Sequence, residues 1–264
     1  MIKIAVNGAV GRMGSRILAL ASEAPKDFEI AGAFEHEKSG QRGQRLSLGK
    51  QSLLVEGINK SSLKGKGVLI DFSGPTGTSA ALVHAAKAGW GVVVGTTGLE
   101  PAIQKSIQKF SRTIPIVYSA NMSVGVNLIA KLVALAAEKL GKDFDIEITE
   151  AHHRHKKDAP SGTALLLAEA ITRAKGWQLE KVLKMRKPGK SETERSNEEI
   201  GMQVIRAGEI VGDHTVLFAG LAETIEITHR AQSRDTFARG ALTAATFLSK
   251  KKSGLFTMAD VLGI

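Results

Sequence analysis

The chain has 264 residues, 43% of them hydrophobic, and a formal net charge of +10 at pH 7. Its length allows one large domain or two smaller ones, and the absence of cysteine excludes disulfides, thiolate–metal sites and a cysteine nucleophile. No apolar run approaches the ~18 residues of a membrane helix, and the initial MIKIAVNG lacks the pattern of an export signal. We therefore expect a cytoplasmic protein without a membrane partner.

The positive charge is compatible with nucleic acid or with small anionic ligands. The lysines and arginines are spread along the chain, and the only aromatic residues besides phenylalanine are Trp90, Trp177 and Tyr118. Since proteins that bind single strands stack bases on aromatic side chains, we favour small anions and expect no nucleic-acid partner.

The first 35 residues follow the order strand, glycine turn, helix, strand and acid. We predict strands at 2–6 and 29–34 and a helix at 15–24. The glycines between the first strand and the helix are Gly8, Gly11 and Gly14. This order is typical of a dinucleotide-binding unit, although the GxxGxxG spacing departs from GxGxxG. The alternative is a glycine turn that only packs the helix against the strand.

Polar residues around this turn indicate the cofactor. Glu35 stands about 20 residues after the glycines, where a carboxylate accepts hydrogen bonds from ribose hydroxyls. Arg12, within the turn, is predicted to face phosphate. His36 and Lys38 are placed to meet a 2′-phosphate, so the sequence indicates NADPH as well as NADH.

Residues 39–62 are predicted to form a mostly irregular connection, and an alternation of strands and helices follows. The expected strands are 68–72, 92–94 and 114–118, and the expected helices are 78–88 and 99–112. Such an alternation indicates a parallel sheet covered on both faces. Ligands of these sheets lie beyond the carboxyl ends of the strands. The small polar residues at 95–97 and 119–122 therefore suit a nicotinamide or ribose, with ordinary turn chemistry as the alternative.

The second half of the chain changes character. We predict helices at 124–140 and 164–174, an exposed segment at 179–199, and a mostly antiparallel open sheet. Its strands are expected at 144–149, 201–206, 210–219 and 224–230, with a tight Ala207–Gly208 turn joining the second and third. The fold class is thus α/β: a Rossmann-like parallel-sheet domain over 1–123, onto which helix 233–264 packs back, and an α+β domain over 124–232. Self-association would cover the open face of the second sheet.

The stretch EITEAHHRHKKDAPSGTA at 147–164 concentrates the candidate chemistry. Three histidines, two lysines and an arginine stand directly before a predicted helix that Ser161 or Asp158 can cap. A helix N-terminus beside cations binds an anion, most simply a carboxylate. The alternative is a solvated basic turn. His152 and His155 have HxxH spacing, but without cysteine or HExxH, and with lysines alongside, we predict no metal.

Seven segments of the chain carry a resemblance to a known family. They are NGAVGRMG at 7–14, DFSGPTGT at 71–78, GTTG at 95–98, SANMSVGVN at 119–127, EAHHRHKKDAPSGTA at 150–164, RAGEIVGDHTVLFAG at 206–220 and EITHRAQSRDTFARGA at 226–241. Together they resemble the 4-hydroxy-tetrahydrodipicolinate reductase (dihydrodipicolinate reductase) family over essentially the whole chain. The block at 150–164 is the most specific of them.

The resemblance implies the residues of the cofactor site. Glu35 would contact the adenosine ribose. His36 stands where better-known members carry an arginine. This departure puts a preference for NADPH in doubt, because imidazole is a poorer phosphate partner than guanidinium. The pyrophosphate would lie at Gly8, Ala9, Val10, Gly11, Arg12 and Met13. The nicotinamide half would lie at Gly95, Thr96, Thr97, Ser119, Ala120, Asn121 and Met122.

The resemblance also implies the reaction. NADH or NADPH would reduce a cyclic imine dicarboxylate of the lysine and diaminopimelate pathway, with hydride added at ring C4 and then protonation. His152 would be the acid/base residue and Lys156 the proton donor. His153 and the backbone of Gly162 and Thr163 would bind the substrate carboxylates. The family likeness further implies a homotetramer assembled through the C-terminal sheet.

Three other functions compete with this one. A semialdehyde dehydrogenase shares the two-domain plan, but those that acylate phosphate need a cysteine, which this chain lacks. A nucleotide sensor would use the first domain without catalysis. A nucleic-acid binder would rest on the charge of +10, and its binding would weaken steeply with salt.

Overall fold

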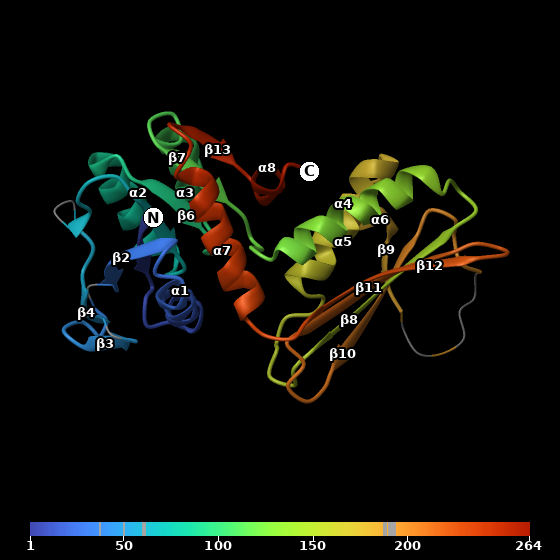
Figure 1. Ribbon diagram of the computed structural model, residues 1–264. Helices are drawn as coiled ribbons and strands as arrows, with labels where there is room; N and C mark the ends of the chain where they lie inside the picture. The colour runs from blue at the N-terminus through green and yellow to red at the C-terminus, as the bar shows by residue number, and fades with distance from the viewer. Residues whose placement is uncertain (37, 50, 60–61, 187–188, 190–193) are drawn as a thin grey trace. The chain divides into compact units, whose positions relative to one another are not determined.

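The computed structural model describes residues 1–36, 38–49, 51–59, 62–186, 189 and 194–264. The chain divides into two compact units, shown in Figure 1. The N-terminal unit comprises Met1–Val124 and Arg234–Ile264, and the C-terminal unit comprises Gly125–Ser233. The last helical segment of the chain is thus part of the first unit.

An eight-stranded sheet forms the centre of the N-terminal unit, in the order β13-β7-β6-β5-β1-β2-β4-β3. Every pair in it is parallel except β3–β4. The strands are β1 (Ile2–Asn7), β2 (Phe28–Phe34), β3 (Arg45–Leu48), β4 (Gln51–Glu56), β5 (Val68–Asp71), β6 (Gly91–Val94), β7 (Pro115–Tyr118) and β13 (Gly254–Phe256). The helices are α1 (Arg12–Glu23), α2 (Pro75–Ala88), α3 (Pro101–Phe110), α7 (Asp235–Leu248) and α8 (Met258–Leu262).

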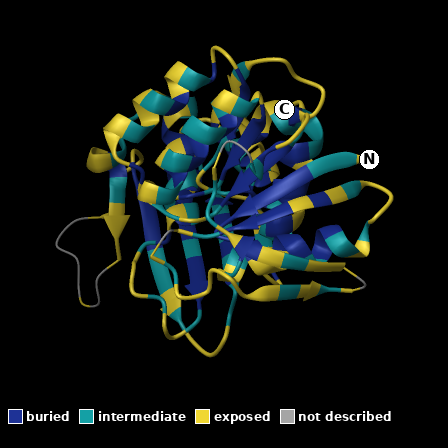
Figure 2. Cartoon of the chain, turned by 90° about the vertical axis from the view of Figure 1, so that its left-hand side faces the viewer, coloured by how far each residue is buried: buried dark blue, intermediate teal, exposed yellow. Residues whose placement is uncertain are grey.

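Alternation along the strands builds one hydrophobic core on each face of this sheet. Ile4 and Val6 of β1 lie in a cluster with residues of α1 and α7, whereas Ala5 lies in a cluster with residues of α2 and α3. Figure 2 shows the central strands of the sheet buried and the helices half exposed. The predicted parallel sheet with helices on both faces is therefore confirmed.

The prediction of an irregular connection at 39–62 is wrong, because β3 and β4 form a hairpin there. Gly49 has a positive φ of 58° in the turn, which suits glycine in a tight hairpin. The partly buried Leu46, Leu48 and Leu53 pack against the core on the α1 and α7 side. The apolar alternation is only four to six residues long in each strand, which made it weak evidence in a segment rich in glycine and charge.

A five-stranded sheet forms the C-terminal unit, in the order β12-β11-β8-β10-β9. The helices pack on one face of it, where Val133 of α4 and Leu167 of α5 meet Ile148 and Phe218 of the sheet. This confirms the predicted α+β class with an open sheet. The elements are α4 (Val124–Lys139), β8 (Asp145–His152), α5 (Gly162–Lys175), α6 (Leu179–Val182), β9 (Leu183–Met185), β10 (Ile200–Arg206), β11 (Gly212–Ala219) and β12 (Thr224–Ala231).

The hairpin predicted at Ala207–Gly208 is wrong. β8 lies between β10 and β11, pairing parallel with β10 and antiparallel with β11, and β11 continues antiparallel to β12. β10 also pairs parallel with β9, so both of its edges are already occupied. Ala207 instead donates its backbone N–H to the carbonyl of His152 (2.9 Å). This hydrogen bond extends the parallel pairing of β10 with β8, so that the ends of the two strands lie side by side.

The segment 179–199 is more ordered than the predicted exposed excursion. It contains α6 and β9, and Val182 is buried in the core of the C-terminal unit. Residues 187–188 and 190–193 of this segment lie outside the described residues. Across the described chain, no helix has both the length and the apolar character needed to cross a membrane.

Candidate active site

The glycine turn after β1 is shaped by close backbone contacts. Gly8 has a φ of +80°, and a Cβ there would lie 2.6 Å from the carbonyl oxygen of Phe72. A Cβ on Gly14 would lie 2.1 Å from the carbonyl oxygen of Gly8. Only glycine fits either position without displacing backbone. The turn therefore brings the first turn of α1 directly against the end of β1.

The helix α1 begins at Arg12, three residues before the predicted start. Gly11 provides no side-chain cap, and the first N–H groups of a helix have no acceptor within the helix. Arg12 is exposed and Met13 is half-buried, whereas Ala9 is buried. An uncapped helix N-terminus reached through a narrow glycine turn is suited to a phosphate group.

Glu35 lies directly after β2 and is held against this turn. Its Oε1 accepts a hydrogen bond from the backbone N–H of Val10 (3.0 Å). His36 follows on the surface, and its Nδ1 accepts a hydrogen bond from the backbone N–H of Lys38 (3.2 Å). The structure thus brings the predicted ribose acid to the predicted pyrophosphate turn.

Asp71, which ends β5, joins the ends of three neighbouring strands. Its fully buried carboxylate accepts hydrogen bonds from Asn7 (2.7 Å), Ser73 (2.6 Å), Thr78 (2.5 Å) and Thr96 (2.9 Å). Burial raises the pKa of Asp71, and these hydrogen bonds offset only part of that rise. Asp71 was not among the predicted site residues; the available signal was a carboxylate ending an otherwise apolar strand.

The predicted turns at 95–97 and 119–122 use several of their polar groups internally. Thr96 is buried against Asp71, whereas Thr97 is exposed. A Cβ on Gly95 would lie 2.3 Å from the Phe72 ring, so the turn lies tightly on the β5 loop. For contacts with a ligand, the turn at 95–97 therefore offers its backbone groups and the Thr97 side chain, but not the hydroxyl of Thr96.

In the turn after β7, side chains brace the backbone. Ser119 Oγ donates to the carbonyl of Asn121 (2.8 Å), and Asn121 Oδ1 accepts from the N–H of Ser123 (2.9 Å). Ala120 is exposed, and Met122 lies in the hydrophobic core. Met122 was predicted to contact the cofactor, but its side chain faces the core and leaves only its backbone for such a contact.

His152 is the last residue of β8, and its imidazole is paired with a buried carboxylate. Its Nδ1 lies 2.5 Å from Oε2 of Glu150, which points to the same side of the strand. Burial lowers the pKa of His152, while Glu150 raises it in part and the charges of Lys156 and Arg206 lower it further. This arrangement suits proton exchange at the second ring nitrogen, Nε2, which does not contact Glu150.

Arg206, at the end of β10, clamps the same carboxylate. Its Nη1 and Nη2 donate to the two oxygens of Glu150, each at 2.9 Å, and the backbone N–H of Ser161 donates to Glu150 Oε1 (3.1 Å). Burial raises the pKa of Glu150, but hydrogen bonds from Arg206 and His152 outweigh it and hold the pKa below its ordinary value. Glu150 is therefore an ionised, acceptor-only group.

A second buried histidine, His214 of β11, completes this cluster. Its ring meets that of His152 edge to face at 5.1 Å between centroids, and its Nε2 lies 3.0 Å from Ser161 Oγ. Burial, and then the nearby charge of His152, lower the pKa of His214 to about 4. His214, Arg206 and Glu150 were not predicted as site residues, because their roles depend on which strands are neighbours.

Lys156, the predicted proton donor, and His153, a predicted substrate ligand, lie in the loop after β8. Lys156 Nζ donates to Asp158 Oδ2 (2.7 Å), and its side chain is only 20% exposed. His153 has a buried Nδ1 without a hydrogen-bond partner among the described residues. His155 is exposed and lies 3.5 Å from Glu209. The loop thus directs Lys156 inward and His155 outward.

Ser161, and not Asp158, caps α5. Its Oγ accepts a hydrogen bond from the backbone N–H of Ala164 (3.1 Å). Gly162 and Thr163 begin the helix, and a Cβ built on Gly162 would meet no heavy atom within 4 Å. The first turn of α5 is therefore open on the Gly162 side, as a site for an anionic group requires.

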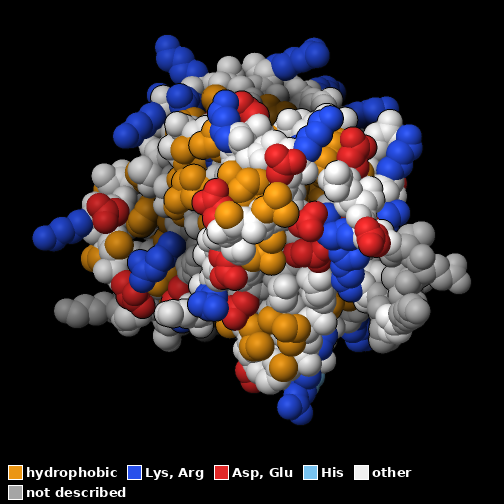
Figure 3. All heavy atoms as spheres, turned by 90° about the vertical axis from the view of Figure 1, so that its right-hand side faces the viewer, with side chains coloured by type: hydrophobic (Ala, Val, Ile, Leu, Met, Phe, Trp, Pro, Cys, Tyr) orange, Lys and Arg blue, Asp and Glu red, His pale blue; other side chains and the backbone are white. Residues whose placement is uncertain are grey.

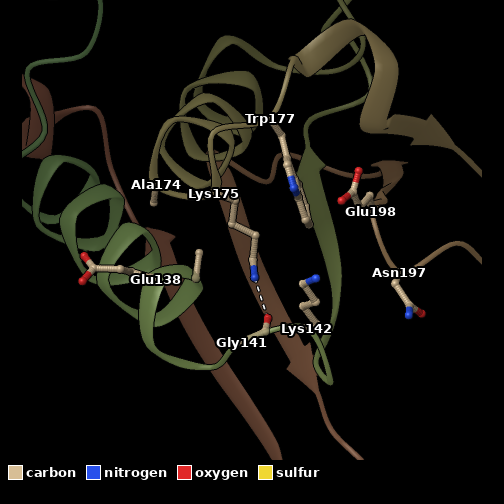
Figure 4. A pocket seen from close by; sticks show the side chains of 9 residues that line it. Glu138, Gly141, Lys142, Ala174, Lys175, Trp177, Asn197 and Glu198 are labelled. Carbon is tan, nitrogen blue, oxygen red and sulfur yellow. Dashed lines mark hydrogen bonds between the residues drawn. The ribbon is translucent and has the colours of Figure 1, made fainter.

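A hollow of about 410 Å³ lies elsewhere in the C-terminal unit, at the C-terminal ends of α4 and α5 (Figure 4). Lys175 reaches across it, donating to the carbonyl of Gly141 (2.6 Å) while its ammonium lies 5.2 Å from the ring of Trp177. A lysine at two helix ends stabilises the last carbonyls. The hollow contains none of the predicted site residues. Among the described residues, no group of three or more histidine, aspartate or glutamate side chains is placed to hold a metal ion.

Comparison with known proteins agrees with both halves of this description. The family model described as "Dihydrodipicolinate reductase, N-terminus" matches residues 2–122, and that described as "Dihydrodipicolinate reductase, C-terminus" matches residues 125–262. The 4-hydroxy-tetrahydrodipicolinate reductase of Nitrosomonas eutropha is 45% identical, covering 100% of this chain and 99% of the relative. That of Nitrosomonas europaea is 46% identical, covering 100% and 98%.

A solved structure shows the same fold. It is the dipicolinate-bound dihydrodipicolinate reductase from Paenisporosarcina sp. TG-14, which superposes with a TM-score of 0.76 over 98% of both chains at 22% identity. The family models cover almost the whole chain, and the relatives match it end to end. The chain therefore belongs to the dihydrodipicolinate reductase family.

Proposed function

We propose that this chain catalyses the reduction of 4-hydroxy-tetrahydrodipicolinate to tetrahydrodipicolinate, in lysine and diaminopimelate biosynthesis in the cytoplasm. As a member of this reductase family, it is an oxidoreductase that uses NADH or NADPH. The observation that carries the proposal is the buried Glu150–His152 pair beside the N-terminus of α5, at the start of a cation-rich loop.

The glycine turn of the N-terminal unit fits the cofactor's pyrophosphate. A Cβ on Gly8 or Gly14 would collide with backbone, and the first turn of α1 has no side-chain cap. Glu35, held by Val10, is placed to accept hydrogen bonds from the adenosine ribose. The backbone at 95–97 and 119–122, at the ends of β6 and β7, would hold the nicotinamide half.

The loop after β8 suits a substrate with two carboxylates. Gly162 and Thr163 would offer backbone N–H groups at the start of α5, and His153 would contribute its imidazole. Lys156 and His152 would lie beside the ring. Two anionic groups explain why so much positive charge stands before a single helix.

In the proposed reaction the chain stabilises developing charge and delivers a proton. The substrate would lose water to form a conjugated imine, and NADH or NADPH, when bound, would supply the hydride for ring C4. Electrons shift toward the ring nitrogen and leave an enamine that must be protonated. The cationic loop stabilises this charge. His152 acts as the acid/base residue through Nε2, and Lys156 as the proton donor.

The state of His152 follows from its surroundings. Burial lowers the pKa of the imidazole, so without substrate it is mostly neutral at neutral pH. A dicarboxylate placed beside it favours the charged form and raises the pKa. Substrate binding would therefore favour the protonated form of His152.

The open face of the C-terminal sheet would serve assembly into a homotetramer. The helices pack on the other face, and Thr149, Gln203 and Thr215 lie half-buried on the open one. Thr149 bonds to Gln203 (3.3 Å), and Thr215 to Thr228 (3.0 Å). Short, mutually bonded side chains suit a flat contact with a second copy. Figure 3 shows the right-hand side of the Figure 1 view, where acidic, basic and hydrophobic side chains are interspersed. Sedimentation velocity would measure the assembly directly.

The deciding experiment is an assay with the pathway imine generated in situ. We expect oxidation of NADH or NADPH that depends on the imine, with tetrahydrodipicolinate as the product. A nucleotide sensor would bind the cofactor without turnover. Absence of imine-dependent oxidation with both cofactors would refute the proposed activity.

A further inference from the structure

We propose that Glu150, clamped by Arg206, is the positioning residue that determines which nitrogen of His152 exchanges the proton. It does so by accepting the Nδ1 hydrogen, which leaves Nε2 as the reacting nitrogen. The catalytic consequence rests on the proposed function, in which His152 is the acid/base residue. The placement of the proton on the ring does not depend on that function.

The Glu150 carboxylate is buried completely, and all of its acceptor capacity is used. Oε2 accepts from Arg206 Nη1 (2.9 Å) and meets His152 Nδ1 (2.5 Å). Oε1 accepts from Arg206 Nη2 (2.9 Å) and from the backbone N–H of Ser161 (3.1 Å). These contacts come from β8, β10 and the start of α5, so the carboxylate cannot rotate without losing several hydrogen bonds, and the imidazole cannot rotate without losing its contact with Oε2.

The tautomer of His152 follows from the charge of its partner. A carboxylate surrounded by a guanidinium and a backbone N–H is ionised and has no hydrogen to donate. Nδ1 of His152 must therefore carry the hydrogen between the two groups. Nε2 holds a lone pair when the ring is neutral and a second proton when it is charged.

The surroundings of Nε2 support this assignment. A Cβ on Gly212 of β11 would lie only 3.1 Å from Nε2, so the glycine leaves the nitrogen uncrowded by a side chain at that position. The charged and titratable groups around the ring are Glu150 on β8, Lys156 in the loop, Arg206 on β10 and His214 on β11. Glu150 is the only acid among these four.

Arg206 has a distinct part in this arrangement. A buried carboxylate beside an imidazole would otherwise take the proton itself, because burial disfavours its charge. The two hydrogen bonds from Arg206 keep Glu150 ionised. The proton therefore stays on the imidazole, which can deliver it.

The first test measures the tautomer in the unaltered protein. Long-range ¹H–¹⁵N NMR of histidine-labelled protein distinguishes Nδ1–H from Nε2–H rings, and the spectrum of His152→Gln identifies the signal of His152. We expect an Nδ1–H ring at a pH where His152 is neutral. An Nε2–H ring would overturn the proposal, whatever the enzymatic activity.

The second test uses Glu150→Gln. An amide has one oxygen, which Arg206 would retain, so its NH₂ would face Nδ1 and force the hydrogen to Nε2. In a serine protease triad, the same change from carboxylate to amide lowers kcat by about 10⁴ through the wrong tautomer. We expect kcat to fall roughly 10²–10⁴-fold, the KM for NADH to change less than about twofold, and the alkaline decline of kcat/KM to move to lower pH.

Glu147→Gln is the matched control. Glu147 lies on the same strand but on the opposite face, and it is likewise paired with arginines, Arg186 and Arg195. This variant should keep the tautomer and pH profile of the unaltered protein. If Glu150→Gln kept kcat and the pH profile as well, Glu150 would have no positioning role. A protein inactive on the imine would refute the proposed function, while the tautomer measurement would still decide this inference.

Discussion

The two candidate half-sites differ in the atoms that form them. In the N-terminal unit, the proposed cofactor site is mainly backbone: two glycines that exclude side chains and an uncapped helix start. In the C-terminal unit, the proposed proton-transfer site consists of side chains, with Glu150, His152 and Arg206 drawn from two strands. A backbone site depends on local chain geometry, whereas a side-chain site depends on which strands become neighbours. The first should be sensitive to added atoms and the second to altered charge.

The largest expected effect is a loss of kcat without a change in the affinity for the cofactor. His152→Ala should lower kcat by the ~10²–10⁴-fold of a lost acid/base group. The calorimetric affinity for NADH should stay unchanged, because the glycine turn retains all its contacts. His155→Ala is the matched control, since His155 is an exposed imidazole in the same loop. Turnover that survives in His152→Ala at the level of the control would contradict the assignment.

One buried titratable group in each unit, His214 and Asp71, should respond to acid in opposite directions. Unfolded histidine takes up a proton near pH 6.5, whereas burial holds the pKa of folded His214 at about 4. Between these values the unfolded state binds more protons, so stability falls as the pH falls, by up to ~3 kcal/mol. Burial instead raises the pKa of Asp71, so its contribution is present at low pH and is lost as the pH rises through its folded pKa.

Each unit contains one tryptophan, Trp90 or Trp177, which makes this difference measurable. Urea unfolding of Trp90→Phe, followed by the fluorescence of Trp177, reports on the C-terminal unit. His214→Gln in that background should flatten the decrease of stability between about pH 6.5 and pH 4. His152 and His229, whose pKa values burial also lowers, would account for the slope that is left. An unchanged slope would exclude His214 as its source.

A smaller effect is expected for the acid at the glycine turn. Glu35→Ala removes the acceptor for the Val10 N–H and the proposed acceptor for the ribose. Hydrogen bonds to charged groups contribute about 1.5–3 kcal/mol, so the Kd for NADH measured by calorimetry should rise about tenfold or more. Glu29→Ala, which removes an exposed carboxylate of β2 paired with Lys3, should leave it unchanged. Equal affinities in both variants would remove Glu35 from the site.

The smallest expected effect concerns the choice between cofactors. His36→Arg places a permanent charge beside Glu35, where a guanidinium pairs with a 2′-phosphate better than imidazole does. The ratio of kcat/KM for NADPH to that for NADH should rise, by roughly tenfold or less. His155→Arg adds the same charge in the other unit and should leave the ratio constant. A ratio that moves equally in both variants would point to general electrostatic attraction.

The order of residues along the chain was sufficient to predict much of the N-terminal unit. A strand, three glycines, a helix and an acid within 35 residues are consecutive, so their pattern is visible without tertiary contacts. The β3–β4 hairpin was missed because its apolar alternation is short and lies among charged residues. Thr96 was predicted to face the cofactor, but its hydroxyl turns inward to Asp71, a partner 25 residues away.

What the sequence determined by itself is the family resemblance, the two kinds of sheet and the cationic stretch around His152 that follows a predicted strand. These follow from periodicity and from motifs of adjacent residues. Only the tertiary structure decided that β8 lies between β10 and β11, and with it the meeting of Glu150, Arg206 and His214 around one imidazole. Strand order depends on long-range pairing among several strands with similar alternation, and no local pattern encodes which of them become neighbours.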